Sequence, residues 1–149
     1  MVLKRSDRFK PIHSMAQQNE DIAAQTLGKI QRELSQHHVK LSELIKYYQD
    51  YTMRFNEQAE KGMSIGQVQS YQQFISQLEI AITEQKKHIS RTTEACDSSR
   101  ADWTAERQKT QVLEKVINRY QKQEQVVTNR QEQHRSDEFV ANRLWHKNK

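Results

Sequence analysis

Apolar residues recur along this chain at alternating steps of four and three residues, the spacing that is typical of a coiled coil. A first series runs from Phe9 to Phe55, and a second runs from Val68 to Val127 and keeps its register over eight heptads. The alternation with period two that a β-strand requires is absent from both series. The pattern therefore predicts two long helices rather than strands or a disordered chain.

A short break separates the two series. We expect Gly62 and Gly66 to end the first helix, because glycine is common just past a helix C-terminus. Ser64 is the expected N-cap of the second helix, and Gln67 three residues later completes a capping box. The predicted elements are a helix over about residues 9–60, a loop over about 61–66 and a helix over about 67–145, within a single coiled-coil domain of residues 1–149.

A loop this short forces the helices to pack antiparallel, so residues that face each other should have numbers that add up to a nearly constant value. With a value of 126, most large apolar side chains face each other across the seam, and the small side chain of Ala23 faces the large one of Trp103. The predicted pairs include Phe55 with Tyr71, Tyr51 with Ile75, Ile30 with Cys96 and Ala23 with Trp103. In this register Cys96 and Trp103 are core side chains rather than a redox site or a ligand-binding site.

The same pairing leaves the second helix longer than the first. Phe9 is expected to face Ile117, so residues from about 118 onward have no antiparallel partner and project roughly 40 Å at 1.5 Å per residue. The predicted fold is thus all-α, a long antiparallel two-helix coiled-coil hairpin with an overhanging C-terminal helix. Two interpretations of the overhang stay open: a fraying tail, or a docking element that orders on binding.

Composition narrows the class of protein. Only 34% of the residues are hydrophobic and the mean hydropathy is −1.05, which is too polar for a thick globular core. The single cysteine excludes an internal disulfide, and we find no apolar run of membrane-spanning or signal-peptide length. These features indicate a reducing cytoplasmic environment, with no direct membrane insertion.

The net charge of +5 is concentrated at the open end of the predicted hairpin. Residues 1–10 hold four basic residues and one acidic residue, and residues 119–149 hold seven basic and four acidic residues, so each stretch has a local charge of +3. An acidic protein surface, an anionic lipid surface and a nucleic acid are all candidate partners of such a pole.

Catalytic and metal-binding motifs are missing from the sequence. We find no glycine-rich phosphate loop and no CxxC pair, and a two-helix hairpin has no pocket in which a pKa is shifted for catalysis. His37 and His38 are adjacent, so their rings point to different faces of a helix and cannot share a metal. We expect no enzymatic activity, no cofactor and no metal.

Some apolar residues near the loop lie off the seam. Tyr47, Phe74 and Ala81 should face solvent, and with Tyr51 and Leu78 they form the edge of one aromatic patch. Scattered exposed hydrophobic residues are common, but a patch rich in Tyr and Phe is also the usual composition of a binding hot spot. Both interpretations of the patch stay open.

Three segments of the sequence are distinctive: Leu44-Ile45-Lys46-Tyr47-Tyr48-Gln49-Asp50-Tyr51, then Tyr71-Gln72-Gln73-Phe74-Ile75 with Leu78, Ala81 and Ile82, and finally Asp137-Glu138-Phe139. Together they resemble the FliJ family of small flagellar export proteins. The resemblance is strongest over about residues 41–85. It implies an antiparallel coiled coil similar to the rotor stalk of rotary ATPases.

The resemblance also implies a non-enzymatic role in the flagellar type III export apparatus. The expected partners are the hexameric export ATPase, whose assembly and activity the chain promotes, the cytoplasmic domain of the export gate, and export substrate chaperones. Candidate gate-binding residues are Leu44, Tyr47, Tyr51, Phe74, Leu78 and Ala81, although the seam buries Leu44 and Leu78. Candidate ATPase-binding residues are Arg5, Phe9, Arg119, Tyr120, Val127, Arg130, Arg135 and Phe139.

These partners imply a cytoplasmic protein that is held at the cytoplasmic face of the inner membrane. Two alternatives from other classes are a basic coiled-coil arm that grips nucleic acid and a purely structural coiled-coil adaptor, such as a homodimer joined through the overhangs. The first predicts an affinity that falls steeply with salt. Acidic residues are mixed among the basic ones and no aromatic residues alternate with them, so we expect no nucleic acid partner.

Overall fold

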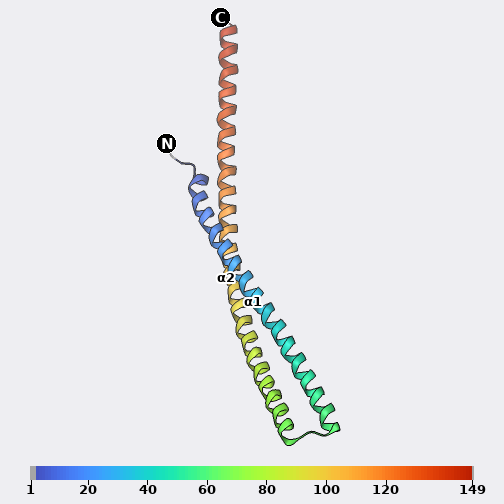
Figure 1. The fold of residues 1–149 in the computed structure, drawn as a ribbon. Helices are drawn as coiled ribbons and strands as arrows, with labels where there is room; N and C mark the ends of the chain where they lie inside the picture. The colour runs from blue at the N-terminus through green and yellow to red at the C-terminus, as the bar shows by residue number, and fades with distance from the viewer. Residues whose placement is uncertain (1–2, 149) are drawn as a thin grey trace. The chain divides into compact units, whose positions relative to one another are not determined.

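The computed structural model describes residues 3–148, which form two α-helices, α1 (Arg5–Lys61) and α2 (Ile65–Lys147). The helices run antiparallel and are joined by a short loop (Figure 1). Within the described residues there is no β-strand, so the all-α hairpin is confirmed. Lys149, one of the basic residues counted in the C-terminal stretch, lies outside the described residues together with Met1 and Val2.

The chain divides into two compact units, each with one stretch of both helices. We call Ala23–Trp103 the loop-end unit, and Met1–Ile22 with Thr104–Lys149 the open-end unit. In both units the residues at the predicted seam positions are buried or half-buried, up to Glu124 on α2. The heptad spacing therefore identified which side of each helix contacts the other.

Contacts next to the loop match the predicted pairing value closely. Phe55 packs on Tyr71 with ring centroids 5.9 Å apart, and the Tyr48 hydroxyl donates a hydrogen bond of 3.3 Å to Glu79. The numbers of these pairs add up to 126 and 127. Cys96 is only 4% exposed and is a free thiol, as expected for a small core side chain, whereas Trp103 is half-buried.

One polar layer interrupts this core. Gln85 is 3% exposed, and its side-chain amide donates a 2.9 Å hydrogen bond to the main-chain carbonyl of His37. The same amide nitrogen lies 3.1 Å from Nδ1 of the His37 ring, which stacks on His88 with centroids 5.9 Å apart. A buried amide with a defined partner favours one alignment of the helices, because any slip would leave it without a hydrogen bond.

The loop consists of Gly62, Met63 and Ser64 only. Gly62 has a φ of +94°, a conformation that side chains with a Cβ rarely adopt, and it ends α1. Ser64 and Gln67 form the predicted capping box, with hydrogen bonds of 3.2 and 3.3 Å in the two directions. The prediction that Gly66 also ends α1 was wrong. Gly66 lies in the first turn of α2, because the Ser64 cap already starts that helix at Ile65.

The open-end unit corrects the predicted start of the overhang. Phe9 stacks on Tyr120 rather than facing Ile117, and Ser6 hydrogen-bonds Glu124, so the numbers of paired residues rise to 129 and 130. The contact stripe ends at Thr128, which is half-buried, whereas the predicted seam residue Val127 is 52% exposed. The unpaired part of α2 therefore starts near residue 129, not 118, and is roughly 30 Å long at 1.5 Å per residue.

The start of α1 explains this shift. The helix begins at Arg5 rather than at about residue 9 and continues through Pro11, which removes one main-chain hydrogen-bond donor. The two turns before Pro11 are held against α2 by the contacts of Ser6 and Phe9. These added turns cover residues of α2 that the sequence had assigned to the overhang.

Candidate functional site

Four aromatic rings gather at the loop end of the hairpin. Tyr51 is at their centre, with its ring centroid 4.4 Å from that of Phe74 and 6.4 Å from that of Tyr71, and Phe55 packs on Tyr71. The guanidinium of Arg54 lies 5.5 Å from the Tyr51 ring centroid, within cation–π range. The heptad register brings these residues together, because each helix contributes two rings at adjacent turns. We call Tyr51, Phe55, Tyr71 and Phe74 the aromatic cluster.

The predicted gate-binding residues differ in exposure. Tyr47 is 56% exposed and Phe74 is 39% exposed, as predicted for residues off the seam. The prediction was wrong for Ala81, which is half-buried, as are Leu44 and Tyr51, and Leu78 is only 8% exposed. Tyr47 and Phe74 thus offer most of the accessible apolar surface of this set, whereas Leu78 fixes the helix spacing beneath it.

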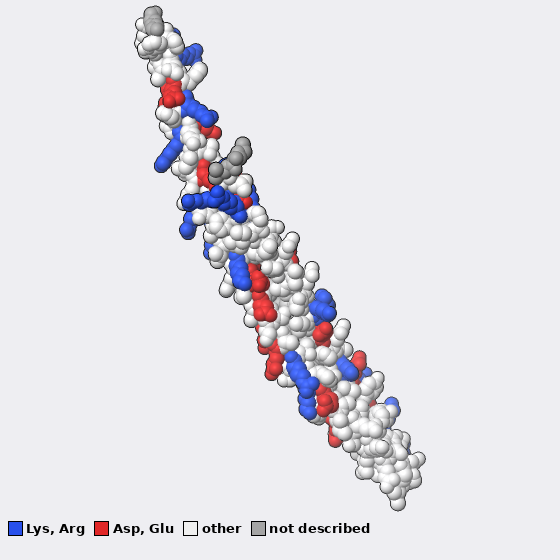
Figure 2. Space-filling view, turned by 90° about the vertical axis from the view of Figure 1, so that its left-hand side faces the viewer, with Lys and Arg blue, Asp and Glu red and all other residues white. Residues whose placement is uncertain are grey.

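The sequence from Gly62 to Leu78 contains no charged residue. Figure 2 shows the result as a surface at the loop end almost free of Lys, Arg, Asp and Glu side chains. Charged residues are depleted in the core of protein–protein interfaces, where Tyr, Trp and Phe are enriched. The absence of charge and the aromatic cluster therefore favour protein binding at the loop end.

The base of the overhang is tied to the start of α1 by a buried hydroxyl. Ser6 is 2% exposed and donates from its Oγ to Glu124 Oε2 at 2.7 Å, while its main-chain N–H donates to Glu124 Oε1 at 3.1 Å. The Ser6 hydroxyl bond, helped by the Ser6 amide and the charge of Lys4, holds the pKa of Glu124 below its ordinary value of 4.5. Partial burial and the nearby charge of Asp7 oppose this shift.

An aromatic pair lies next to this contact. The rings of Phe9 and Tyr120 are stacked with centroids 5.6 Å apart, and the Arg5 guanidinium lies 5.7 Å from the Tyr120 ring centroid. Phe9 and Tyr120 are half-buried, whereas Arg5 is exposed. The structure thus brings together three of the predicted ATPase-binding residues at the base of the overhang.

The other five predicted ATPase-binding residues lie on α2 and are all exposed: Arg119, Val127, Arg130, Arg135 and Phe139. From residue 129 to residue 148 every side chain is exposed. This stretch includes Phe139 at 66% and Leu144 at 57% exposure. A helix whose apolar side chains are this accessible has contact surface to offer a partner on all sides.

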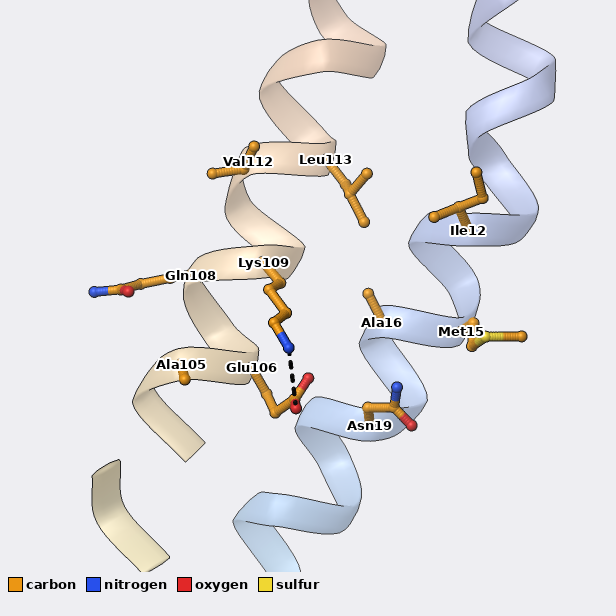
Figure 3. A pocket seen from close by; sticks show the side chains of 10 residues that line it. All are labelled: Ile12, Met15, Ala16, Asn19, Ala105, Glu106, Gln108, Lys109, Val112 and Leu113. Carbon is orange, nitrogen blue, oxygen red and sulfur yellow. Dashed lines mark ion pairs between the residues drawn. The ribbon is translucent and has the colours of Figure 1, made fainter. Parts of the chain in front are cut away.

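An apolar groove of about 670 Å³ lies between the two helices within the open-end unit (Figure 3). Leu113 and Ala16 point toward the facing helix, and Ile12, Met15 and Val112 line the edges with 52%, 65% and 59% exposure. The ion pair between Lys109 and Glu106, at 3.7 Å, lies at one end of the groove. The heptad pattern does not predict this groove, because three of its apolar residues, Ile12, Met15 and Val112, lie off the seam.

Neither described helix is long and apolar enough to cross a membrane. Among residues 3–148, no three side chains of His, Cys, Asp or Glu are grouped as metal ligands.

Comparison with known proteins identifies the family of this chain. A family model described as flagellar FliJ protein matches residues 5–149. The chain belongs to the FliJ family. The flagellar FliJ protein of Escherichia coli (strain K12) is 28% identical over 129 residues, which cover 87% of this chain and 88% of that protein. The flagellar FliJ protein of Salmonella typhi is 27% identical over 132 residues, which cover 89% of this chain and 90% of that protein.

Membership of the FliJ family confirms the resemblance that the aromatic segments carried and supports a flagellar, export-related role. In this FliJ-family chain the two candidate surfaces belong to different compact units. The aromatic cluster with Tyr47 lies in the loop-end unit, and the Ser6–Glu124 contact with the overhang lies in the open-end unit.

Proposed function

We propose that this chain is a non-enzymatic component of the flagellar type III protein export apparatus that binds the hexameric export ATPase through its open-end unit. The observation that carries the proposal is the overhang, a helix whose residues 129–148 are all exposed, in a chain of the FliJ family. An isolated polar helix of this length is marginal in water, so a partner that encloses it would stabilise it.

The base of the overhang supplies the remaining ATPase contacts in this proposal. Arg5 and Arg119 are exposed there, and Arg130 and Arg135 continue the basic surface along the overhang. Guanidinium groups pair in bidentate fashion with carboxylates, so an acidic lining of the ATPase pore is the complementary surface. Inserted there, the chain promotes assembly of the hexamer and stimulates ATP hydrolysis.

The loop-end unit contacts the cytoplasmic domain of the export gate in the same proposal. Tyr47 and Phe74 supply the exposed apolar surface, and the uncharged stretch 62–78 lowers the desolvation penalty of burying it. Export substrate chaperones are further partners. Through these partners the chain is held at the cytoplasmic face of the inner membrane.

Two variants test both halves of the proposal in one experiment. Tyr47→Ala with Phe74→Ala should weaken binding to the isolated gate domain at least about tenfold, the loss typical of hot-spot truncation, and leave ATPase binding unchanged. Arg130→Glu with Arg135→Glu should weaken binding to the ATPase and leave binding to the isolated gate domain unchanged. Circular dichroism of both variants controls for folding. The assignment would be contradicted if either variant lost affinity for both partners equally, or if neither variant lost affinity for any partner.

A further inference from the structure

A second heptad series runs along α2 and points about 110° around the helix from the series that contacts α1, toward the edge of the groove that Val112 lines. It begins at Val112 and reaches Leu144 in strict steps of four and three residues. Four of its five apolar members are accessible, since Val112, Val126, Val140 and Leu144 are 49–59% exposed, and the fifth, Val116, is half-buried. A seam of this kind is the signature of a helix that pairs with another helix.

The order of residues in this seam is matched from both ends toward the middle, where Val126 faces Arg130. When a second α2 is laid antiparallel so that paired residue numbers add up to 256, Val112 faces Leu144 and Val116 faces Val140. The axis of such a pair passes level with residue 128, near the start of the overhang. Apolar side chains at one end of the seam are thereby covered by apolar side chains from the other end.

Polar residues match in the same register. Arg119 faces Asp137, and Gln123 faces Gln133. In the part of the chain that the structure describes, neither Arg119 nor Asp137 forms an ion pair with another residue of its own chain. In an antiparallel pair of chains, Arg119 of each chain would face Asp137 of the other, so two such ion pairs would form.

The occupant of this seam cannot be the overhang of the same molecule. Helix α2 is continuous to Lys147, so residues 140–144 cannot fold back onto residues 112–116 without breaking it. A second chain has no such restriction, and its overhang would run beside the apolar groove edged by Ile12, Met15 and Val112 (Figure 3).

We propose that two copies of this chain form an antiparallel dimer in which the overhang of each packs on the α2 seam and groove of the other. The contact is isologous, the arrangement that closes a two-fold dimer. Each overhang then becomes the third helix of a bundle made with α1 and α2 of the partner. The dimer goes beyond the proposed function, and it would compete with the export ATPase for the overhang.

Sedimentation of the full chain alone tests this dimer, so its result does not depend on the ATPase. The mass should rise from one chain to two between about 1 µM and about 1 mM, the range expected of an interface of limited area. Leu144→Asp should weaken the dimer on the order of 100-fold, because a tenfold loss at each of two equivalent sites multiplies. A chain that remains monomeric at about 1 mM overturns the proposal.

Asn142→Asp is the matched control, since it adds the same charge to the same turn but lies off the seam and is exposed. It should leave the dimer intact. Equal loss from Leu144→Asp and Asn142→Asp would show a general charge effect and overturn the seam. Helicity by circular dichroism should be the same for both variants, which excludes unfolding of the overhang as the cause.

A charge exchange tests the register. Arg119→Glu and Asp137→Arg should each weaken the dimer by placing like charges opposite each other, and the double variant should restore it. A disulfide provides a second check: in a Cys96→Ala background, a Val112→Cys chain mixed with a Leu144→Cys chain should form a linked pair on oxidation, and neither chain alone should. Linkage of either chain to itself, or no rescue by the charge exchange, overturns the antiparallel register.

Discussion

Gln85 offers a sharp test of how the polar layer acts in the loop-end unit. Its amide is 3% exposed and donates a 2.9 Å hydrogen bond to the His37 carbonyl. Gln85→Ala removes this hydrogen bond and leaves a void in the seam, whereas Gln85→Leu fills nearly the same volume with an apolar side chain. The His37 carbonyl lies within a helix, so in both variants it keeps its main-chain partner.

The two substitutions should therefore change the free energy of unfolding by different amounts, and the two changes can have opposite signs. The free energy of unfolding should fall by about 1–3 kcal/mol in Gln85→Ala, from the lost hydrogen bond and the void. In Gln85→Leu it should stay within about 1 kcal/mol of the parent or rise, because replacing a buried polar group by an apolar one of similar size is often neutral or stabilising.

Urea denaturation followed by circular dichroism measures both changes, and hydrogen exchange of main-chain amides near His37 confirms that they arise in the loop-end unit. We further expect Gln85→Leu to loosen the alignment of the two helices, visible as faster amide exchange despite equal or higher stability. A larger loss of stability in Gln85→Leu than in Gln85→Ala would refute the reasoning, because it would mean that the amide bond outweighs burial at this position.

Three other predictions follow from the described contacts. Because the pKa of Glu124 is lowered in the folded chain, the Ser6–Glu124 contact stabilises the start of α1 above pH 4.5, and this stabilisation is lost as the pH falls through the lowered pKa. Amide exchange of the first turns of α1 should therefore rise in that pH range. Ser6→Ala should move the Glu124 pKa back toward 4.5 in an NMR titration, and an unchanged pKa would contradict the assignment. Gly62→Ala should lower the free energy of unfolding by about 1–2 kcal/mol from backbone strain alone, since nothing lies within 4 Å of the added Cβ; a neutral variant would contradict it. Cys96 is 4% exposed, so a thiol reagent should modify it only after unfolding or local opening, and rapid modification of the native chain would show that the seam is open there.

The sequence alone was sufficient for most of the fold. Hydrophobic spacing identified the seam side of both helices, because a coiled coil buries the same two positions of every heptad. The capping box of Ser64 was also predictable, since it depends only on residues three apart. A constant pairing value was accurate near the loop, where the short connection fixes the alignment.

Far from the loop the same rule was less accurate. The shift at Phe9 depends on which side chains stack and hydrogen-bond, and heptad spacing does not specify this. The heptad series, which begins at Phe9, also suggested a later helix start than Arg5, because the contacts that hold the first turns are made with residues more than a hundred positions away. The aromatic cluster was partly predictable, since Tyr51 and Phe74 follow from the register, but the groove beside Met15 combines residues that no single period connects.

The most direct test of the proposed function is the rate of ATP hydrolysis by the hexameric flagellar export ATPase, with the full chain and with a chain that ends at Thr128. This truncation keeps Tyr120 and Glu124, and therefore the contacts of Phe9 and Ser6 that hold the start of α1 against α2. We predict that the full chain stimulates hydrolysis and that the truncated chain, with unchanged helicity per residue up to Thr128, does not. Equal stimulation by both chains would contradict the role assigned to the overhang.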